Sequence, residues 1–196
     1  LGDCGLYMAN RSATLQRIPW IISTAIGLGT WILGYVFTYL IVAPDIRESF
    51  LQRILEAFNG NPATYEMVGW VFFNAHYVNT VFQNVPLIGG QTTTFIGGED
   101  GFTPLLYLIP IGLLVAAGVG IARYQAADSI NRGAFTGITV LPGYLLGVLG
   151  SLFLFEVNIG GVTGGPAMLP GIVLAGLIYP LIFAGAGGMF AGLTSE

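Results

Sequence analysis

The sequence predicts an all-α membrane protein with four transmembrane helices and two external amphipathic helices. Of its 196 residues, 54% are hydrophobic and only 8% are charged, whereas about 25% are charged in ordinary soluble domains. Four long apolar stretches contain no charged residue. The arginines next to these stretches fall mainly on one side. We therefore expect residues 1–196 to form a single polytopic membrane domain.

The four apolar stretches are each long enough to cross a bilayer, which requires about 20 residues of helix. They cover residues 18–43, 104–122, 133–155 and 167–193. Pro19 suits the first turn of the first span, where its missing N–H is not needed. Thr103 is a plausible N-cap for the second span.

Arginine placement predicts the orientation, because cytoplasmic loops carry an excess of basic residues. Four arginines lie on one side of the spans: Arg11, Arg17, Arg123 and Arg132. Only Arg47 and Arg53 lie on the other side. We therefore expect a protein integral to the cell membrane, with both termini cytoplasmic and residues 44–103 forming an external cap.

The first part of this cap has the pattern of an amphipathic helix, "DIRESFLQRILEAFNG". Apolar side chains from Ile46 to Phe58 share one helical face, and charged or polar side chains share the other. Asp45 and Glu48 resemble a capping box, and Asn59-Gly60 provides a stop signal. This helix is expected to lie on the membrane surface or on the bundle, or to bind a partner.

The second part of the cap contains the only histidine, in "GWVFFNAHYVNTVFQN". A helical wheel over residues 67–85 gives one apolar face and one polar face. The polar side comprises Glu66, His76, Asn79, Thr80 and Gln83, and together with Glu156 these residues form the candidate polar or interaction face. A fifth span here would move Arg123 and Arg132 to the outside, so we expect an external helix, surface-bound or re-entrant, packed on the bundle.

Chemistry at this face has two interpretations. His76 and a nearby acid, such as Glu66 or Glu156 at the end of the third span, could form a cation or proton site. Alternatively, His76 is a hydrogen-bonded residue in a helix-packing face beneath a solvated acidic surface, to which Glu99 and Asp100 also belong. The second interpretation is favoured because the spans carry no charge at mid-depth.

Missing motifs argue against an enzyme. One histidine and one cysteine exclude HExxH, zinc ribbons and CxxC pairs, and the absence of lysine excludes a Walker A loop. We therefore expect no catalytic residue, no metal and no cofactor. Scattered arginines also offer no basic patch for nucleic acid.

Glycine, with 30 copies, marks the expected helix-packing positions. Gly143 and Gly147, and likewise Gly188 and Gly192, form small-xxx-small patterns that allow close approach of membrane helices. They indicate packing either inside one bundle or against other subunits. Pro110, Pro142 and Pro180 lie inside spans and predict kinks or a broken helix at a permeation site.

The segments "GYVFTYLIV", "GWVFFNAHYVNT" and "GLIYPLIFAGAGG" resemble small uncharacterised haloarchaeal membrane proteins, some of which carry a generic transporter label. The resemblance implies a haloarchaeal source and the same layout of spans, but no site residues. The sequence as a whole favours a non-catalytic accessory or scaffolding subunit. Its expected partners are the lipid bilayer and a homo-oligomer or larger membrane complex. The alternative is a small oligomeric channel or transporter for an ion or small solute.

Overall fold

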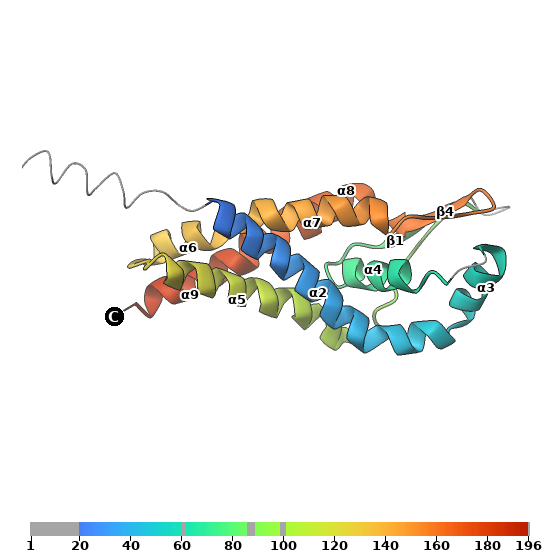
Figure 1. Cartoon of the computed structure of the whole chain (residues 1–196), viewed down its shortest axis with the longest axis horizontal. Coiled ribbons are helices and arrows are strands. Elements are labelled where there is room, and N and C mark those ends of the chain that lie inside the picture. The colour runs from blue at the N-terminus through green and yellow to red at the C-terminus, as the bar shows by residue number, and fades with distance from the viewer. Residues whose placement is uncertain (1–19, 60–61, 86–88, 99–100, 196) are drawn as a thin grey trace, which may run out of the picture.

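A computed structural model describes residues 20–59, 62–85, 89–98 and 101–195 as a helical bundle that carries a small β-sheet at one end (Figure 1). Within these residues, four helices are long and apolar enough to cross a membrane: Trp20–Glu48, Pro104–Tyr124, Ile130–Leu154 and Met168–Leu193. The four expected apolar helices are therefore confirmed to within a few residues at most of their ends. Residues 18 and 19 of the first expected span lie outside the described part.

Both halves of the chain contribute helices and strands. The first half contains α2 (Trp20–Glu48), α3 (Phe50–Asn59), α4 (Thr64–Asn74), β1 (Thr80–Val85), β2 (Gly89–Thr93), the 3-10 turn η1 (Pro104–Tyr107) and α5 (Leu108–Tyr124). The second half contains α6 (Ile130–Ile138), α7 (Leu141–Leu154), β3 (Val157–Ile159), β4 (Val162–Pro166), α8 (Met168–Pro170), the π-helical segments η2 (Gly171–Ile178) and η3 (Pro180–Ala184), and α9 (Gly185–Leu193).

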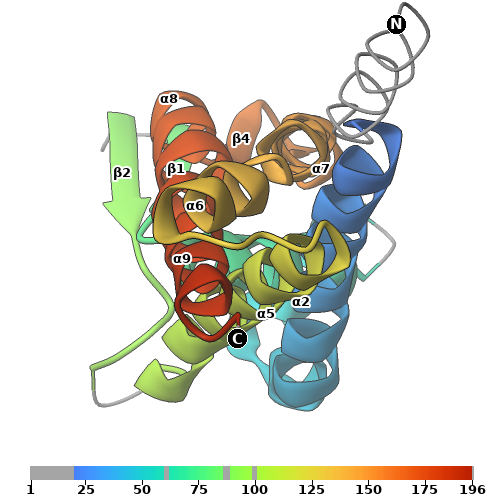
Figure 2. The ribbon, with the colours of Figure 1, turned by 90° about the vertical axis from the view of Figure 1, so that its left-hand side faces the viewer.

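The two ends of the bundle differ in what they carry. The start of α2, the link between α5 and α6, and the end of α9 lie at one end, which Figure 2 views directly. The sheet and α3 lie at the opposite end (Figure 1). Arg123 and Arg132 thus share an end with the start of α2, whereas Arg11 and Arg17 are outside the described residues.

Glycines bring the long helices into backbone contact. A Cβ on Gly143 of α7 would collide with the carbonyl of Thr24 in α2. A Cβ on Gly188 of α9 would collide with the carbonyl of Gly133 in α6. Small residues at these positions allow close approach without a hydrophobic driving force.

The sheet corrects the all-α prediction. Four antiparallel strands lie in the order β2-β1-β4-β3, and β1 pairs with β4 from Thr80↔Pro166 to Gln83↔Thr163. The β3–β4 hairpin turns on Gly160 and Gly161, whose φ values are 59° and 87°. Positive φ at both central residues is the geometry in which glycine is favoured. The predicted cap, residues 44–103, therefore shares its sheet with residues 157–166, which lie between the third and fourth long helices.

The first cap helix also begins differently from the prediction. α2 continues through Pro44 to Glu48, and the helix is interrupted by a bend at Ser49. The Ser49 hydroxyl accepts a 3.1 Å hydrogen bond from the backbone N–H of Gln52 and so acts as the N-cap of α3. The predicted capping box at Asp45 is wrong, because Asp45 lies inside α2.

The second amphipathic helix was also predicted wrongly. α4 ends at Asn74, a turn follows with Tyr77 at φ 58°, and Thr80–Val85 is a strand. Residues Met67–Asn74 are all buried, so α4 has no solvent-facing polar side over this length. It packs against α2 and lies between α2 and α7 (Figure 1).

Candidate functional site

His76 lies in the turn that follows α4 and reaches the middle of the bundle. Its ring centroid is 5.3 Å from that of Trp31, 6.1 Å from that of Tyr144 and 4.9 Å from that of Tyr179. These three aromatic residues come from the middle parts of three different long helices. α4 therefore runs from the sheet end into the bundle and stops there, and the His76 side chain is completely buried.

Both ring nitrogens of His76 have partners. Nδ1 lies 2.8 Å from the Phe72 carbonyl, and Nε2 lies 2.8 Å from the Tyr144 hydroxyl. Because a carbonyl can only accept, Nδ1 carries the proton, and in the neutral ring Nε2 accepts from Tyr144. Burial lowers the pKa of His76 to about 4, despite an opposing contribution from the Phe72 carbonyl. The side chain is thus a neutral, fully hydrogen-bonded imidazole.

Two more aromatic side chains of the interior, Trp31 and Tyr179, are also hydrogen-bonded. Trp31 Nε1 donates to Ser151 Oγ at 2.8 Å, and Tyr179 donates to the Ala75 carbonyl at 3.3 Å. Trp31 also packs edge-on against Tyr144, with ring centroids 5.1 Å apart. The middle of the bundle is therefore filled by aromatic rings with internal hydrogen bonds, as expected for buried polar groups.

Asn74 is a positioning residue that the sequence did not single out. Its Nδ2 donates to the Val78 carbonyl at 2.7 Å, and its Oδ1 accepts from the backbone N–H of Phe95 at 2.8 Å. These bonds hold the turn after α4 and tie it to the strand region that follows. When residues 67–85 are placed at helical spacing, Asn74 is the one polar residue on the apolar face, and an isolated polar residue there is a signal that its side chain needs a buried partner.

The residues of the predicted polar face do not lie on one side of a helix in the structure. His76 and Thr80 are buried, whereas Asn79 and Gln83 are exposed. Gln83 joins the exposed Glu156 in lining a small groove of about 230 Å³ beside β1 and β4. Glu66 does not line this groove and lies on α4. One of its carboxylate oxygens is buried and has no hydrogen-bond partner among the described residues.

The predicted packing glycines lie inside the bundle. Gly143 and Gly147 of α7 face Thr24 and Trp31 of α2. Gly188 and Gly192 of α9 face the backbone of α6 and of the residue before it, Ser129. Glu99 and Asp100, the other predicted acids, lie outside the described residues.

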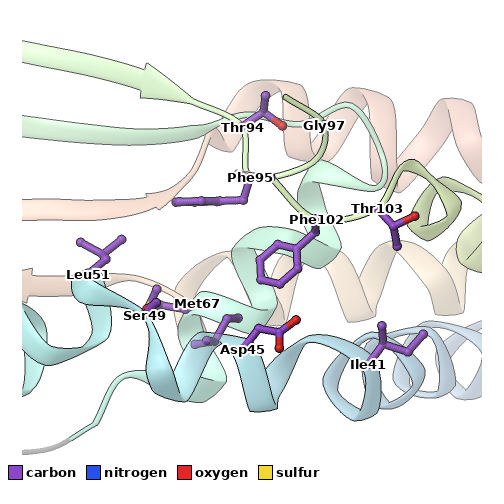
Figure 3. Close-up of a pocket in the computed structure, with 12 residues that line it drawn as sticks. Ile41, Asp45, Ser49, Leu51, Met67, Thr94, Phe95, Gly97, Phe102 and Thr103 are labelled. Atoms are coloured by element: carbon purple, nitrogen blue, oxygen red, sulfur yellow. The ribbon is translucent and has the colours of Figure 1, made fainter. Parts of the chain in front are cut away.

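A larger cavity of about 760 Å³ opens between the sheet-side end of α2 and the loop before η1 (Figure 3). Its walls include Met67, Phe95 and Phe102, with Thr94 and Thr103 in the loop. The carboxylate of Asp45 and the ring of Phe102 point into the same space (Figure 3). No sequence pattern predicted this cavity, because its walls come from distant segments that only the fold brings together.

Four apolar helices around a closed aromatic interior define a small helical bundle that is compatible with a membrane protein. The chain belongs to a family of unknown function, DUF7978, whose model matches residues 8–195. No curated protein and no solved structure matches the chain. The family match agrees with the resemblance to uncharacterised proteins, while the haloarchaeal source and the transporter label stay predictions.

Proposed function

We propose that the protein is a non-catalytic accessory or scaffolding subunit that packs against another membrane protein. In this proposal the four long helices cross the cell membrane, the termini are cytoplasmic and the sheet end is external. The two supporting features are a closed interior and a small-residue surface on α5 that none of the described residues covers.

The closed interior favours a structural role over transport through the monomer. The completely buried His76 has both ring nitrogens occupied, by the Phe72 carbonyl and the Tyr144 hydroxyl. Within the described residues, no group of three or more His, Cys, Asp or Glu side chains could hold a metal ion. Transport sites in membranes usually present an available polar group at mid-depth.

The observation that carries the proposal is the outer face of α5. Gly112, Ala116 and Gly120 are spaced four residues apart and are all exposed. A Cβ added to Gly112 or Gly120 would meet nothing within 4 Å. By contrast, Gly118 of the same helix packs against the Ala184 carbonyl. Among the residues that the structure describes, Gly112 and Gly120 pack against no neighbour, and a stripe of small residues lets a second helix approach closely.

A channel or transporter is the second candidate, and one feature favours it. α4 enters the bundle and ends at mid-length, next to the long π-helical segments η2 and η3 around Tyr179 and Pro180. Interrupted helices and π-helical turns are frequent at functional sites. If the protein is a channel or transporter, several copies would have to form the permeation path together, since side chains fill the interior of one copy.

Purification from native membranes separates the two candidates. The accessory role predicts a stoichiometric second protein in the particle and no solute flux when the chain alone is placed in liposomes. A homo-oligomer that contains no other protein and supports ion or solute flux would overturn it.

A further inference from the structure

We propose that the cavity beside Asp45 binds an organic ammonium ion, that is, a protonated or quaternary amine with an apolar body. The cavity of about 760 Å³ is within the usual range for small-molecule sites, about 300 to 1,000 Å³. It lies at the sheet end of the bundle, away from both His76 and the outer face of α5. The proposal is therefore independent of the accessory role.

The charge in the cavity comes from Asp45. It is the one charged residue among the described lining residues, and its side chain is exposed. Within the described residues it makes neither an ion pair nor a side-chain hydrogen bond; the ion pair found there joins Arg132 and Asp128. The nearby Arg47 points elsewhere, because its guanidinium donates to the Tyr39 hydroxyl at 3.0 Å. The Asp45 carboxylate is thus available to a cation.

Aromatic and apolar side chains form the opposite wall. Phe102 and Phe95 come from the loop, and Met67 comes from α4. Phe95 is held in place by stacking against Trp70, with ring centroids 6.2 Å apart and an interplanar angle of 17°. A carboxylate facing aromatic rings attracts a cation both by its charge and through the electron-rich ring faces.

The same walls argue against an inorganic cation. Calcium takes six to eight oxygen ligands, and magnesium requires a near-octahedral oxygen shell. Among the described lining residues, the side-chain oxygens come from Asp45, Ser49, Thr94 and Thr103 only. Over the part of the lining that the structure describes, one carboxylate beside apolar walls matches an ammonium group with hydrocarbon substituents instead.

The test is calorimetric titration of the full-length protein in detergent with benzyltrimethylammonium, using benzenesulfonate as a probe of opposite charge. We expect saturable binding of the cation and none of the anion. Asp45→Asn is expected to weaken binding about tenfold, and Phe102→Leu about threefold. Glu156→Gln removes an exposed carboxylate at the same end of the bundle, in the other groove, and is expected to change nothing.

Three results would overturn the proposal. The first is no saturable binding of the cation to the unaltered protein. The second is equal binding to Asp45→Asn, provided that this variant elutes and melts like the parent. The third is complete displacement of the cation by millimolar Ca²⁺ or Mg²⁺, which would assign the carboxylate to a metal ion.

Discussion

The hydroxyl of Tyr144 in α7 donates a 2.8 Å hydrogen bond to Nε2 of His76, a residue 68 positions earlier in the chain. This bond joins the turn after α4 to the third long helix. Both side chains are almost completely buried. This hydrogen bond therefore holds the end of α4 against α7 at mid-length of the bundle. The two side chains also fill part of the bundle interior.

Removing the hydroxyl of Tyr144 tests this relationship. Tyr144→Phe leaves the Nε2 lone pair of His76 buried and without a donor, so we expect the free energy of unfolding to fall by about 1–3 kcal/mol. Tyr124→Phe removes an exposed hydroxyl and should be neutral. Unfolding in mixed detergent with increasing SDS measures both. Equal stability of the two variants would show that the bond contributes nothing.

Acid should destabilise the protein through His76. Burial lowers its pKa to about 4, whereas the unfolded chain has the ordinary value near 6.5. The unfolded state therefore binds the proton first, and stability present above pH 6.5 is lost as the pH falls toward 4. The full loss is about 3 kcal/mol, because each pH unit between the two pKa values is worth about 1.4 kcal/mol.

His76→Gln provides the control for this pH dependence. The chain has a single histidine, so the variant removes the group that titrates in this window. It should be less stable than the parent at pH 7 but nearly independent of pH between 6.5 and 5. A parent protein with the same flat profile would contradict a buried neutral imidazole. His76→Leu should likewise impair stability or assembly more than any activity.

Two glycines on α7 make a matched pair for helix packing. Gly143→Ala places a methyl group against the Thr24 carbonyl, and we expect a loss of about 1–3 kcal/mol. Gly150→Ala points into open space and should raise stability by up to about 1 kcal/mol, because alanine favours the helix. Unfolding measurements that rank the two variants in the opposite order would place the α2–α7 contact elsewhere.

The four apolar helices could be predicted because hydropathy accumulates along one continuous segment and needs no partner. The sheet could not, since β1 pairs with β4 across a long stretch of chain, with Thr80 opposite Pro166, 86 residues later. Its one local signal was Gly160-Gly161 between two short β-prone runs, a two-residue hairpin pattern. That signal was obscured by the many other glycines.

The candidate site was predicted in part. His76 was recognised as a residue that needs a polar partner, but its partners Phe72 and Tyr144 come from the preceding helix α4 and from the distant helix α7. The helical wheel was extended to Val85 because the apolar spacing continued. In the structure the helix ends at Asn74. The Asn74 side chain forms hydrogen bonds with the backbone of Val78 and Phe95, and these hydrogen bonds stabilise the turn that ends the helix.

In the proposed accessory role, the outer face of α5 packs against another membrane protein. The most direct measurement is the ratio of the co-purifying partner to this chain in particles from native membranes, compared between Ala116→Leu and Gly150→Leu. Both changes add a bulky side chain at an exposed helix position, so the fold should tolerate each. We predict that Ala116→Leu loses the partner while Gly150→Leu keeps it. Retention of the partner by folded Ala116→Leu would contradict the packing of α5 against a partner. A parent particle with no second protein would also contradict it.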